Sequence, residues 1–393
     1  MFETLSLAPP DKILSLSVLY RNDPRAEKMD LGVGVYKDSE GRTLIMNAVR
    51  EAEKRLYDTQ TTKTYVGMGG DDGFNKGMLK LVFGEDADVS RMFACQTAGG
   101  SGALRTIADL LKKAKPDATV WLSDPTWANH APILTAGGLK TATYPYFDAA
   151  TGGVKFDAMV EALKTIPAGD VVLLHGCCHN PTGANLTLDQ WAVVADILVE
   201  KGLFPFVDLA YQGFGDGLEE DAAPVRLLAG KVPEMAIATS CSKNFSVYRD
   251  RVGAVILMAP DAERAKIAGS QALIVTRVLY SMPPDHAAAA VRIILEDDAL
   301  RANWKTELEE MRLRMLNLRT GFAEALRRQS NSSRFDFIAE HRGMFSRLGI
   351  TEDQVNRLRE DYGIYMVGDS RFNVAGLKED RLEDLAKAVV SVL

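Results

Sequence analysis

Lys243 is the residue whose type and surroundings best suit covalent chemistry. It lies in the run Ser240-Cys-Ser-Lys-Asn-Phe245, between the apolar runs Met235–Ala238 and Val252–Met258. Short apolar runs bounded by polar residues predict buried strands, so Lys243 should follow a strand end with its amine free. A free amine can form an imine with an aldehyde. Most lysines in loops are simply solvated, so this prediction depends on companion residues.

A glycine-rich segment, Gly99-Gly-Ser-Gly102, precedes a helical pattern that we expect to begin near Ala103. Backbone N–H groups at a helix N-terminus, aided by the helix dipole, bind anions such as phosphate. The segment lacks both the GKS/T ending and the GxGxxG spacing of familiar phosphate loops. A phosphate site and a tight turn therefore both remain open from these residues alone.

Asp208 follows the apolar run Leu203–Val207. In sheets of parallel strands, ligands bind in the crevice outside the carboxyl ends of the strands. An aspartate at that place is either a helix N-cap or a residue that binds a ligand. The presence of Lys243 favours the second interpretation.

Short apolar runs alternate with longer stretches of helical period, which predicts an α/β fold with a mainly parallel sheet covered by helices on both faces. The predicted strands are Thr119–Leu122, Lys140–Tyr144, Val171–Leu174, Leu203–Val207, Met235–Ala238 and Val252–Met258. The predicted helices between them are Ala103–Lys113, Asp157–Lys164 and Leu188–Lys201.

From about Leu300 the pattern changes to a long charged helix, Trp304–Gln329, with one apolar stripe. The stripe consists of Leu308, Met311, Met315, Leu318 and Phe322. A smaller α+β section follows and ends in an amphipathic helix, Glu379–Val392. The change of pattern places a domain boundary near residue 310.

The bulk composition excludes several classes of protein. The chain has 393 residues, 47% hydrophobic and 25% charged, with a net charge of −7. This balance gives no basic surface for nucleic acid and no polybasic cluster for a membrane. The N-terminus lacks the pattern of a signal peptide, so we expect a cytoplasmic protein.

Four cysteines form no CxxC pair, which favours reduced thiols over disulfides. His175, Cys177, Cys178 and His179 are zinc-ligand types. They follow a predicted strand, however, where alternate side chains point to opposite faces and would not converge. We expect no metal site.

Four segments in this order along the chain resemble the class I aminotransferases, which are pyridoxal-phosphate enzymes of fold type I, and most closely their aspartate and aromatic amino acid branch. The segments are Ala98–Ala103, His179-Asn-Pro-Thr-Gly183, Val207–Tyr211 and the Lys243 run. The resemblance extends from Leu31-Gly-Val-Gly-Val-Tyr36 to Asp369–Gly376. It implies an N-terminal arm (residues 1–12), a small domain (13–43 and 311–393) and a large cofactor-binding domain (44–310).

The resemblance also implies a role for each matching residue around pyridoxal phosphate. Lys243 would hold the aldehyde and carry the substrate's α-proton, and Asp208 would keep the ring nitrogen protonated. Tyr211 and Asn180 would donate hydrogen bonds to the phenolic oxygen of the cofactor. The other implied positions are Gly100, Ser101, Ser240 and Arg251 at the phosphate, Tyr65 at the phosphate of the neighbouring subunit, Trp127 stacked on the ring, and His130 orienting Asp208.

Carboxylate substrates call for arginine, whose planar fork binds both oxygens. By resemblance, Arg371 would bind the α-carboxylate, and Arg277 would reach from the neighbouring subunit to the distal carboxylate of aspartate or glutamate. Gly34, Tyr65, Trp127 and Asn180 complete the implied substrate contacts. The resemblance therefore implies an obligate homodimer with composite sites and a ping-pong exchange of amino groups with 2-oxoglutarate.

Three positions depart from the aspartate-specific pattern. Met282 replaces an asparagine behind the distal arginine, Ser101 replaces a threonine, and Ser246 replaces a glycine. Because methionine is apolar and adaptable, we expect a dual pocket that accepts acidic substrates on Arg277 and aromatic ones when that side chain turns away.

Three other functions compete with this interpretation. A lyase or decarboxylase on the same fold would share Lys243 and Asp208, although two carboxylate-binding arginines favour transamination. A regulatory cofactor-binding protein would carry a DNA-binding module, and no such module is visible in the sequence. A nicotinamide dehydrogenase would carry a GxGxxG fingerprint, which the sequence lacks.

Overall fold

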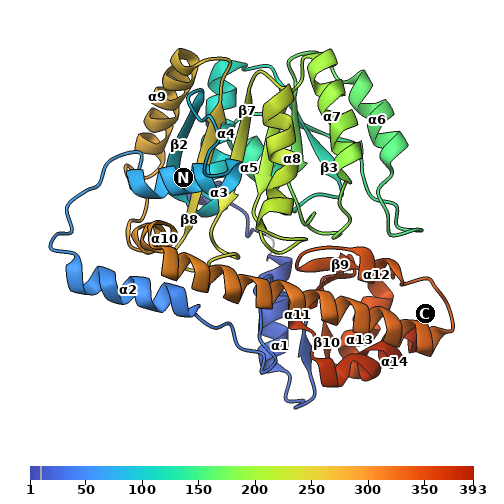
Figure 1. Cartoon of the computed structure of the whole chain (residues 1–393). Helices are drawn as coiled ribbons and strands as arrows, with labels where there is room; N and C mark the ends of the chain where they lie inside the picture. The colour runs from blue at the N-terminus through green and yellow to red at the C-terminus, as the bar shows by residue number, and fades with distance from the viewer. Residues whose placement is uncertain (9–10) are drawn as a thin grey trace.

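A seven-stranded sheet organises the fold, with strand order β2-β8-β7-β6-β5-β3-β4 (Figure 1). The computed structural model describes residues 1–8 and 11–393. The strands are β2 (Met92–Ala98), β3 (Thr119–Asp124), β4 (Lys140–Pro145), β5 (Val171–His175), β6 (Phe204–Leu209), β7 (Met235–Ser240) and β8 (Val252–Met258). Within this sheet, β8 runs opposite to the other six strands, so the predicted α/β fold with a mainly parallel sheet is confirmed.

All six predicted strands form in the seven-stranded sheet, and its remaining strand, β2, was not predicted. In β2, Gln96 and Thr97 interrupt the apolar pattern but are fully buried. The side chain of Gln96 is satisfied because it accepts a hydrogen bond from the backbone N–H of Asp71 and donates one to the carbonyl of Pro284. A buried polar residue with such partners does not destabilise the strand.

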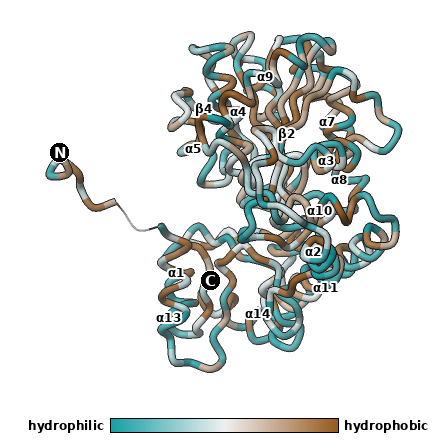
Figure 2. Tube along the Cα trace, turned by 90° about the vertical axis from the view of Figure 1, so that its left-hand side faces the viewer, coloured by the Kyte–Doolittle hydropathy of each residue, from teal (hydrophilic) through white to brown (hydrophobic). Residues whose placement is uncertain are grey.

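Helices cover both faces of the sheet, which explains why the strands are apolar on both sides. Val171 and Leu173 of β5 pack in one cluster, and Val172 and Leu174 pack in the other. Figure 2 shows the hydrophobic colour concentrated between the helices. One face carries α4 (Gly99–Ala114), α5 (His130–Ala136) and α9 (Ala262–Leu279); the other carries α3 (Asp72–Phe83), α6 (Phe156–Thr165), α7 (Leu188–Lys201) and α8 (Leu218–Lys231).

The predicted start of α4 near Ala103 is wrong, because the helix begins at Gly99. Glycine has low helix propensity, so the glycine run suggested a loop. The close approach of β7 and β8 requires these small residues: a Cβ on Gly100 would lie 3.1 Å from Cβ of Ser240.

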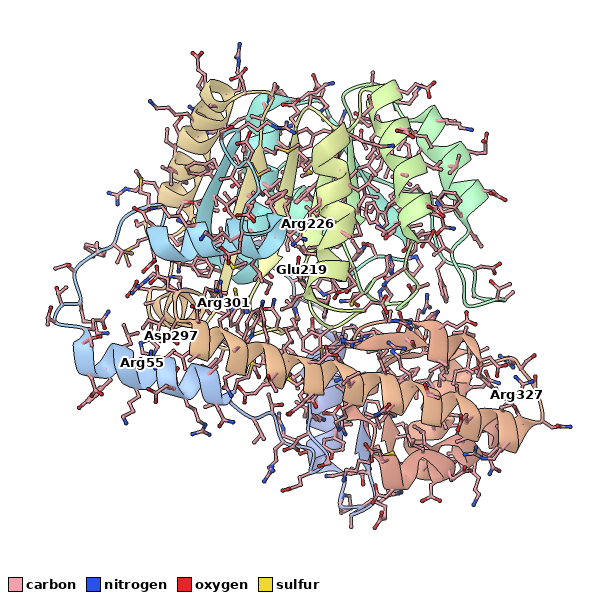
Figure 3. All side chains as sticks on the ribbon, in the orientation of Figure 1. Arg55, Glu219, Arg226, Asp297, Arg301 and Arg327 are labelled. Atoms are coloured by element: carbon pink, nitrogen blue, oxygen red, sulfur yellow. The ribbon has the colours of Figure 1, made fainter. Side chains whose placement is uncertain are left out.

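Helix α11 (Asp298–Ser330) is longer than predicted and runs below the sheet (Figure 1). All five residues of the predicted apolar stripe are buried. Asp297 caps the helix by accepting a hydrogen bond from the N–H of Leu300. Its carboxylate also pairs at 2.7 Å with Arg55 of α2 (Asn47–Thr59); Figure 3 labels both residues.

The N-terminal and C-terminal parts of the chain pack together. Strand β1 (Met29–Asp30) pairs in parallel with β10 (Ile364–Tyr365), and the guanidinium of Arg25 donates to the carbonyls of Arg359 and Glu360. The remaining elements are α1 (Lys12–Asn22), α10 (His286–Glu296), α12 (Phe337–Glu340), β9 (Phe345–Arg347), α13 (Glu352–Tyr362), β11 (Arg371–Asn373), α14 (Leu382–Ser391) and the 3₁₀ helices η1 (Phe2–Thr4), η2 (Val374–Gly376) and η3 (Glu379–Arg381).

The predicted boundary near residue 310 falls inside the continuous helix α11, so the division into domains stays a prediction. Residues 1–8 expose Phe2, Leu5 and Leu7 and lie apart from the rest of the chain (Figure 2). Pro9 and Pro10 of the predicted arm lie outside the described residues. Within residues 1–8 and 11–393, no helix combines the length and apolar character needed to cross a membrane.

Candidate active site

A cavity of about 220 Å³ lies where the carboxyl ends of β5, β6 and β7 face the C-terminal elements. Residues far apart in the sequence meet there, from α1 to β11. The cavity is lined by Ile13, Gly34, Gly100, Ser101, Leu104, Trp127, His175, Asn180, Asp208, Ala210, Tyr211, Ser240, Ser242, Lys243, Tyr248, Arg251, Phe345 and Arg371. Most of the predicted site residues are thus brought together.

Lys243 lies in a turn directly after β7. The aromatic ring of Phe245 stacks on Trp304 of α11 with centroids 4.4 Å apart, and the indole N–H of Trp304 donates to the carbonyl of Asn244 at 2.7 Å. These contacts fix the turn, and Nζ of Lys243 lies 4.8 Å from the ring centroid of Tyr211. Burial lowers the pKa of Lys243 to about 8, an effect that the charge of Asp208 partly offsets.

Asp208 is 8% exposed and lies at the end of β6. One carboxylate oxygen is 3.0 Å from Nε2 of His130, and Nδ1 of the same ring is 2.7 Å from the hydroxyl of Thr126. Burial by itself raises the pKa of Asp208, but the hydrogen bond with His130 and the nearby imidazole and ammonium groups outweigh it, so the pKa lies below its ordinary value. The predicted orienting role of His130 matches this geometry.

The predicted phosphate end combines a helix N-terminus with a cation. Gly99 has φ +70°, a conformation that favours glycine, and a Cβ there would lie 2.6 Å from Nη2 of Arg251. Arg251 donates to the hydroxyl of Ser242 at 3.3 Å and to the carbonyl of Tyr248 at 3.0 Å. It makes no ion pair with a carboxylate in the part of the chain that the structure describes. Free N–H groups, a hydroxyl on Ser240 and an unpaired guanidinium suit a phosphate.

The opposite end of the cavity contains Arg371, which is 6% exposed. Its Nη2 donates to the carbonyl of Gly32 at 3.0 Å, and its guanidinium lies 4.4 Å from the ring centroid of Phe345. Nε of Arg371 is buried without a partner. Burial lowers the pKa of this guanidinium. A carboxylate entering the cavity would supply the missing acceptor and charge.

Asn180 and Tyr211 lie side by side, with the amide Nδ2 of Asn180 3.4 Å from the Tyr211 hydroxyl. Oδ1 of Asn180 is buried without a partner. Burial raises the pKa of Tyr211 above its ordinary value, so its hydroxyl stays protonated and able to donate. Gly34 also lines the cavity, and a Cβ at this position would lie 3.0 Å from the ring of Phe345.

Comparison with known proteins identifies the family. The model of aminotransferase class I and II matches residues 26–389. The chain belongs to this family. It is 52% identical to an aromatic-amino-acid aminotransferase of Paracoccus denitrificans and 45% identical to an aspartate aminotransferase of Escherichia coli, with 100% of each chain covered. An aromatic-amino-acid aminotransferase from Burkholderia pseudomallei, covalently bound to pyridoxal phosphate, superposes with a TM-score of 0.98 at 41% identity, over 100% of this chain and 99% of that one.

Two predicted site residues of this aminotransferase lie away from the cavity. Tyr65 is 89% exposed, and Arg277 is exposed in the last turn of α9. Neither lines the cavity. Their segments are neighbours, because the N–H of Val66 lies 3.1 Å from the sulfur of Met282. The prediction that both residues serve a neighbouring subunit remains a prediction.

Sequence reasoning missed several residues of the aminotransferase cavity, chiefly Phe345 and His175. Phe345 lies in the run Gly343-Met-Phe-Ser-Arg347, which carried no chemical signal apart from its glycine. His175 ends β5 opposite Asp208, and both of its ring nitrogens are buried without partners. Burial lowers the pKa of His175 to about 3.

The expectation that the His175–His179 side chains would not converge is only partly correct. The extended backbone ends at His175, and Cys178 has φ +50°. The two thiols of Cys177 and Cys178 therefore meet the carboxylate of Asp221, with ligand atoms within 4.8 Å. That carboxylate already accepts N–H bonds from Gly213, Gly215 and Asp216, and we assign no metal to it.

Proposed function

We propose that this aminotransferase binds pyridoxal phosphate through Lys243 and transfers amino groups from aromatic amino acids and aspartate to 2-oxoglutarate. The observation that carries the proposal is a half-buried lysine of lowered pKa that shares one cavity with Asp208 and Arg371. The names of the relatives, aromatic-amino-acid and aspartate aminotransferases, support the choice of substrates.

The residues present fit the cofactor at each of its polar groups. The amides at the start of α4, the hydroxyl of Ser240 and the guanidinium of Arg251 would hold the phosphate. Asp208 would pair with the protonated ring nitrogen, while Tyr211 and Asn180 would donate to the phenolic oxygen, and Trp127 would cover the ring. When bound, the cofactor supplies a reactive aldehyde and a ring that withdraws electrons from the α-carbon of the substrate.

Lys243 is the residue that would move the proton. A general base works best when its pKa lies near the working pH, and the pKa of this amine is about 8. Once substrate has released it, the amine would take the α-proton. Asp208 would remain ionised throughout, because its pKa lies below the ordinary value.

Arg371 would bind the α-carboxylate of either substrate through its unpartnered Nε and its remaining N–H groups. We infer that Arg277 and Tyr65 come from the neighbouring subunit, since both are exposed and neither lines the cavity of its own chain. The working unit would then be a homodimer. Arg277 would bind the distal carboxylate and would turn away for an aromatic side chain, leaving Met282 as adaptable apolar surface.

A cytoplasmic location fits the four cysteines, which are all buried and unpaired, because reduced thiols persist in a reducing compartment. A lyase or decarboxylase is not favoured, since the relatives are named as aminotransferases.

Visible absorbance of the purified protein with added pyridoxal phosphate tests the proposal. A band that shifts on addition of glutamate indicates transamination, and borohydride reduction followed by peptide mapping should place the label on Lys243. A colourless protein, or a label elsewhere, would overturn it. A panel of amino donors with 2-oxoglutarate then tests the substrates. A preference of a thousandfold or more for aspartate over phenylalanine in kcat/KM, about 4 kcal/mol, would rule out the dual pocket.

A further inference from the structure

Arg319 is an arginine in the middle of α11 with no exposed surface. It makes no ion pair with a carboxylate in residues 1–8 and 11–393. Its guanidinium instead donates to four neutral acceptors in one short stretch of chain: the carbonyls of Ile338 (3.2 Å), Gly343 (2.7 Å) and Phe345 (2.8 Å) and the hydroxyl of Ser346 (2.7 Å). Burial lowers the pKa of Arg319 to about 9, so it remains charged at neutral pH.

A buried charge without a counter-ion is costly. Leu318 and Phe322, two apolar residues of the same helix, are buried with Arg319. An apolar side chain would fill this place at lower cost unless the backbone carbonyls of 338–345 needed donors. The guanidinium therefore acts as a clamp on that segment.

The clamped segment carries one wall of the cavity. The ring of Phe345 lies 4.4 Å from the guanidinium of Arg371 and contacts Gly34. Strand β9 also pairs with β11, so that Ser346 lies opposite Phe372 and Arg347 lies opposite Arg371. A shift of the clamped segment would thus move both the ring that covers Arg371 and the strand that carries it.

The same segment also supports the loop of Asn180. The N–H of Arg342 donates to the carbonyl of Gly183 at 2.9 Å. A Cβ on Gly183 would lie 2.3 Å from the carbonyl oxygen of Phe345, the same oxygen that Arg319 binds. The Asn180 loop and the strand that pairs with the Arg371 strand therefore approach each other at the carbonyl of Phe345. Arg319 donates a hydrogen bond to this carbonyl.

We propose that Arg319 is a positioning residue for the α-carboxylate site, because its four hydrogen bonds fix the distance between Phe345, Arg371 and the Asn180 loop. The inference rests on the proposed function of Arg371. Lysine cannot replace it, because an ammonium carries three donors at a point and lacks the planar fork that reaches acceptors on several residues.

The test uses Arg319→Lys and Arg319→Met in the protein loaded with pyridoxal phosphate. The probe is 3-phenylpropionate, which has the carboxylate and ring of phenylalanine but no amino group to react. Its dissociation constant is read from the visible absorbance of the cofactor. We expect either substitution to weaken probe binding about tenfold or more, the equivalent of about 1.4 kcal/mol, while uptake of the cofactor stays at one per chain.

Leu326→Ala is the matched control, since Leu326 is a fully buried residue of the same helix. It should lower the melting temperature without changing the dissociation constant of the probe by more than about twofold. Should Arg319→Lys lower the melting temperature and leave probe binding within twofold of wild type, the positioning role is wrong. If neither Arg319 variant folds, Ser346→Ala replaces them in the test, because it removes one of the four acceptors. Unchanged binding of the probe to Ser346→Ala would overturn the inference.

Hydrogen–deuterium exchange separates this inference from the proposed function. Arg319→Lys should speed exchange of the amides in residues 343–347 and 371–373, compared with wild type and Leu326→Ala. Failure of the wild type to bind the probe would count against the proposed substrates, and unaltered exchange in Arg319→Lys would count against the clamp.

Discussion

The two ends of the cavity differ in how much of the site a single chain provides. At the cofactor-ring end, Asp208 and His130 are buried and lie 3.0 Å apart, and Lys243 is half-buried directly after β7, the strand next to the one that carries Asp208. At the far end, where Arg371 lies, the described cavity lining supplies no further lysine or arginine for a second carboxylate, since Lys243 and Arg251 belong to the cofactor site. Tyr65 and Arg277, the residues expected there, are exposed.

From this difference we infer that residues at the strand ends determine the chemistry, whereas the surface segments of Tyr65 and Arg277 determine the choice of substrate. Strand ends are held by hydrogen bonds on both sides and tolerate little movement. The segment of Tyr65 contacts the segment after α9 through Val66 and Met282, and a second copy would complete this part of the site, as symmetric dimers allow. Substitutions at the ring end should therefore affect every substrate, and those at the far end only some.

The largest effect is expected from Lys243→Ala. Loss of the amine removes both cofactor attachment and proton transfer, and kcat for all amino donors should fall about 10⁴-fold, the upper range for a positioned acid–base group. Steady-state assays with phenylalanine and with aspartate check this. Lys231→Ala, which removes an exposed lysine paired with Asp196, is the control. If Lys243→Ala lowered kcat for one substrate only, the expectation that substitutions at the cofactor-ring end affect every substrate would be wrong.

Asp208→Asn should reduce kcat for both substrates about 10³-fold, because a charge pair at ~4 Å and an effective dielectric of ~20 contributes about 4 kcal/mol. Asp170→Asn is the matched control. Asp170 is also buried, at the other end of β5, and accepts hydrogen bonds from the N–H of Thr119 and the indole of Trp121. That control should lower stability and leave kcat unchanged. Equal losses of kcat in both variants would contradict the role of Asp208.

The cofactor-ring end was also the part of the cavity that the sequence predicted best. Asp208 and Lys243 follow apolar runs that form strands, and strand ends are local features that a sequence shows directly. The position of His130 behind Asp208 came from family resemblance, because their contact joins residues 78 apart in sequence.

Phe345 and Arg319 escaped prediction for a different physical reason. Phe345 acquires its role only from Gly34 and Arg371, which come from distant segments. Arg319 lies in a helix rich in charge, where an arginine normally faces water, but residues 338–346 pack against the helix and accept its hydrogen bonds. Long-range contacts of this kind leave no periodic pattern in the sequence.

Arg277→Leu sharpens the comparison at the far end. Charge-assisted hydrogen bonds to a carboxylate contribute about 3 kcal/mol at most, so kcat/KM for aspartate should fall about 10²-fold. The value for phenylalanine should stay within about threefold. The ratio of the two kcat/KM values is the measurement. A parallel loss for phenylalanine would mean that Arg277 supports the fold rather than the distal carboxylate.

Mixed dimers test whether Arg277 acts across subunits. Lys243→Ala chains and Arg277→Leu chains should each have about 1% of wild-type activity toward aspartate or less, and a mixture of the two should regain about a quarter of wild-type activity, since half of the dimers carry one complete site of two. No recovery in a confirmed mixture would place Arg277 in its own chain's site.

The pH dependence of cofactor capture tests the lowered pKa at the ring end. Only the neutral amine attacks an aldehyde, and burial favours the neutral form, so the neutral fraction of Lys243 rises up to its pKa of about 8 and then levels. The rate of capture by cofactor-free protein should rise about tenfold from pH 7 to pH 9 and change little above it. Nα-acetyl-lysine, an ordinary amine, is the reference and should keep rising beyond pH 9. A protein profile that follows the reference would show an unshifted lysine.

The smallest effect is expected from Met282→Asn, which alters only the surroundings of the far end. An amide there can hydrogen-bond and support Arg277 toward an acidic substrate, a gain of about 1 kcal/mol, so the ratio of kcat/KM for aspartate to that for phenylalanine should rise about fivefold. Val278→Asn, an exposed substitution next to Arg277, should leave the ratio unchanged. Met282 contacts Val66, which lies beside Tyr65. If Met282→Asn instead lowered kcat for both substrates, this contact would also support the cofactor-ring end. The two ends of the cavity would then not act separately on chemistry and on substrate choice.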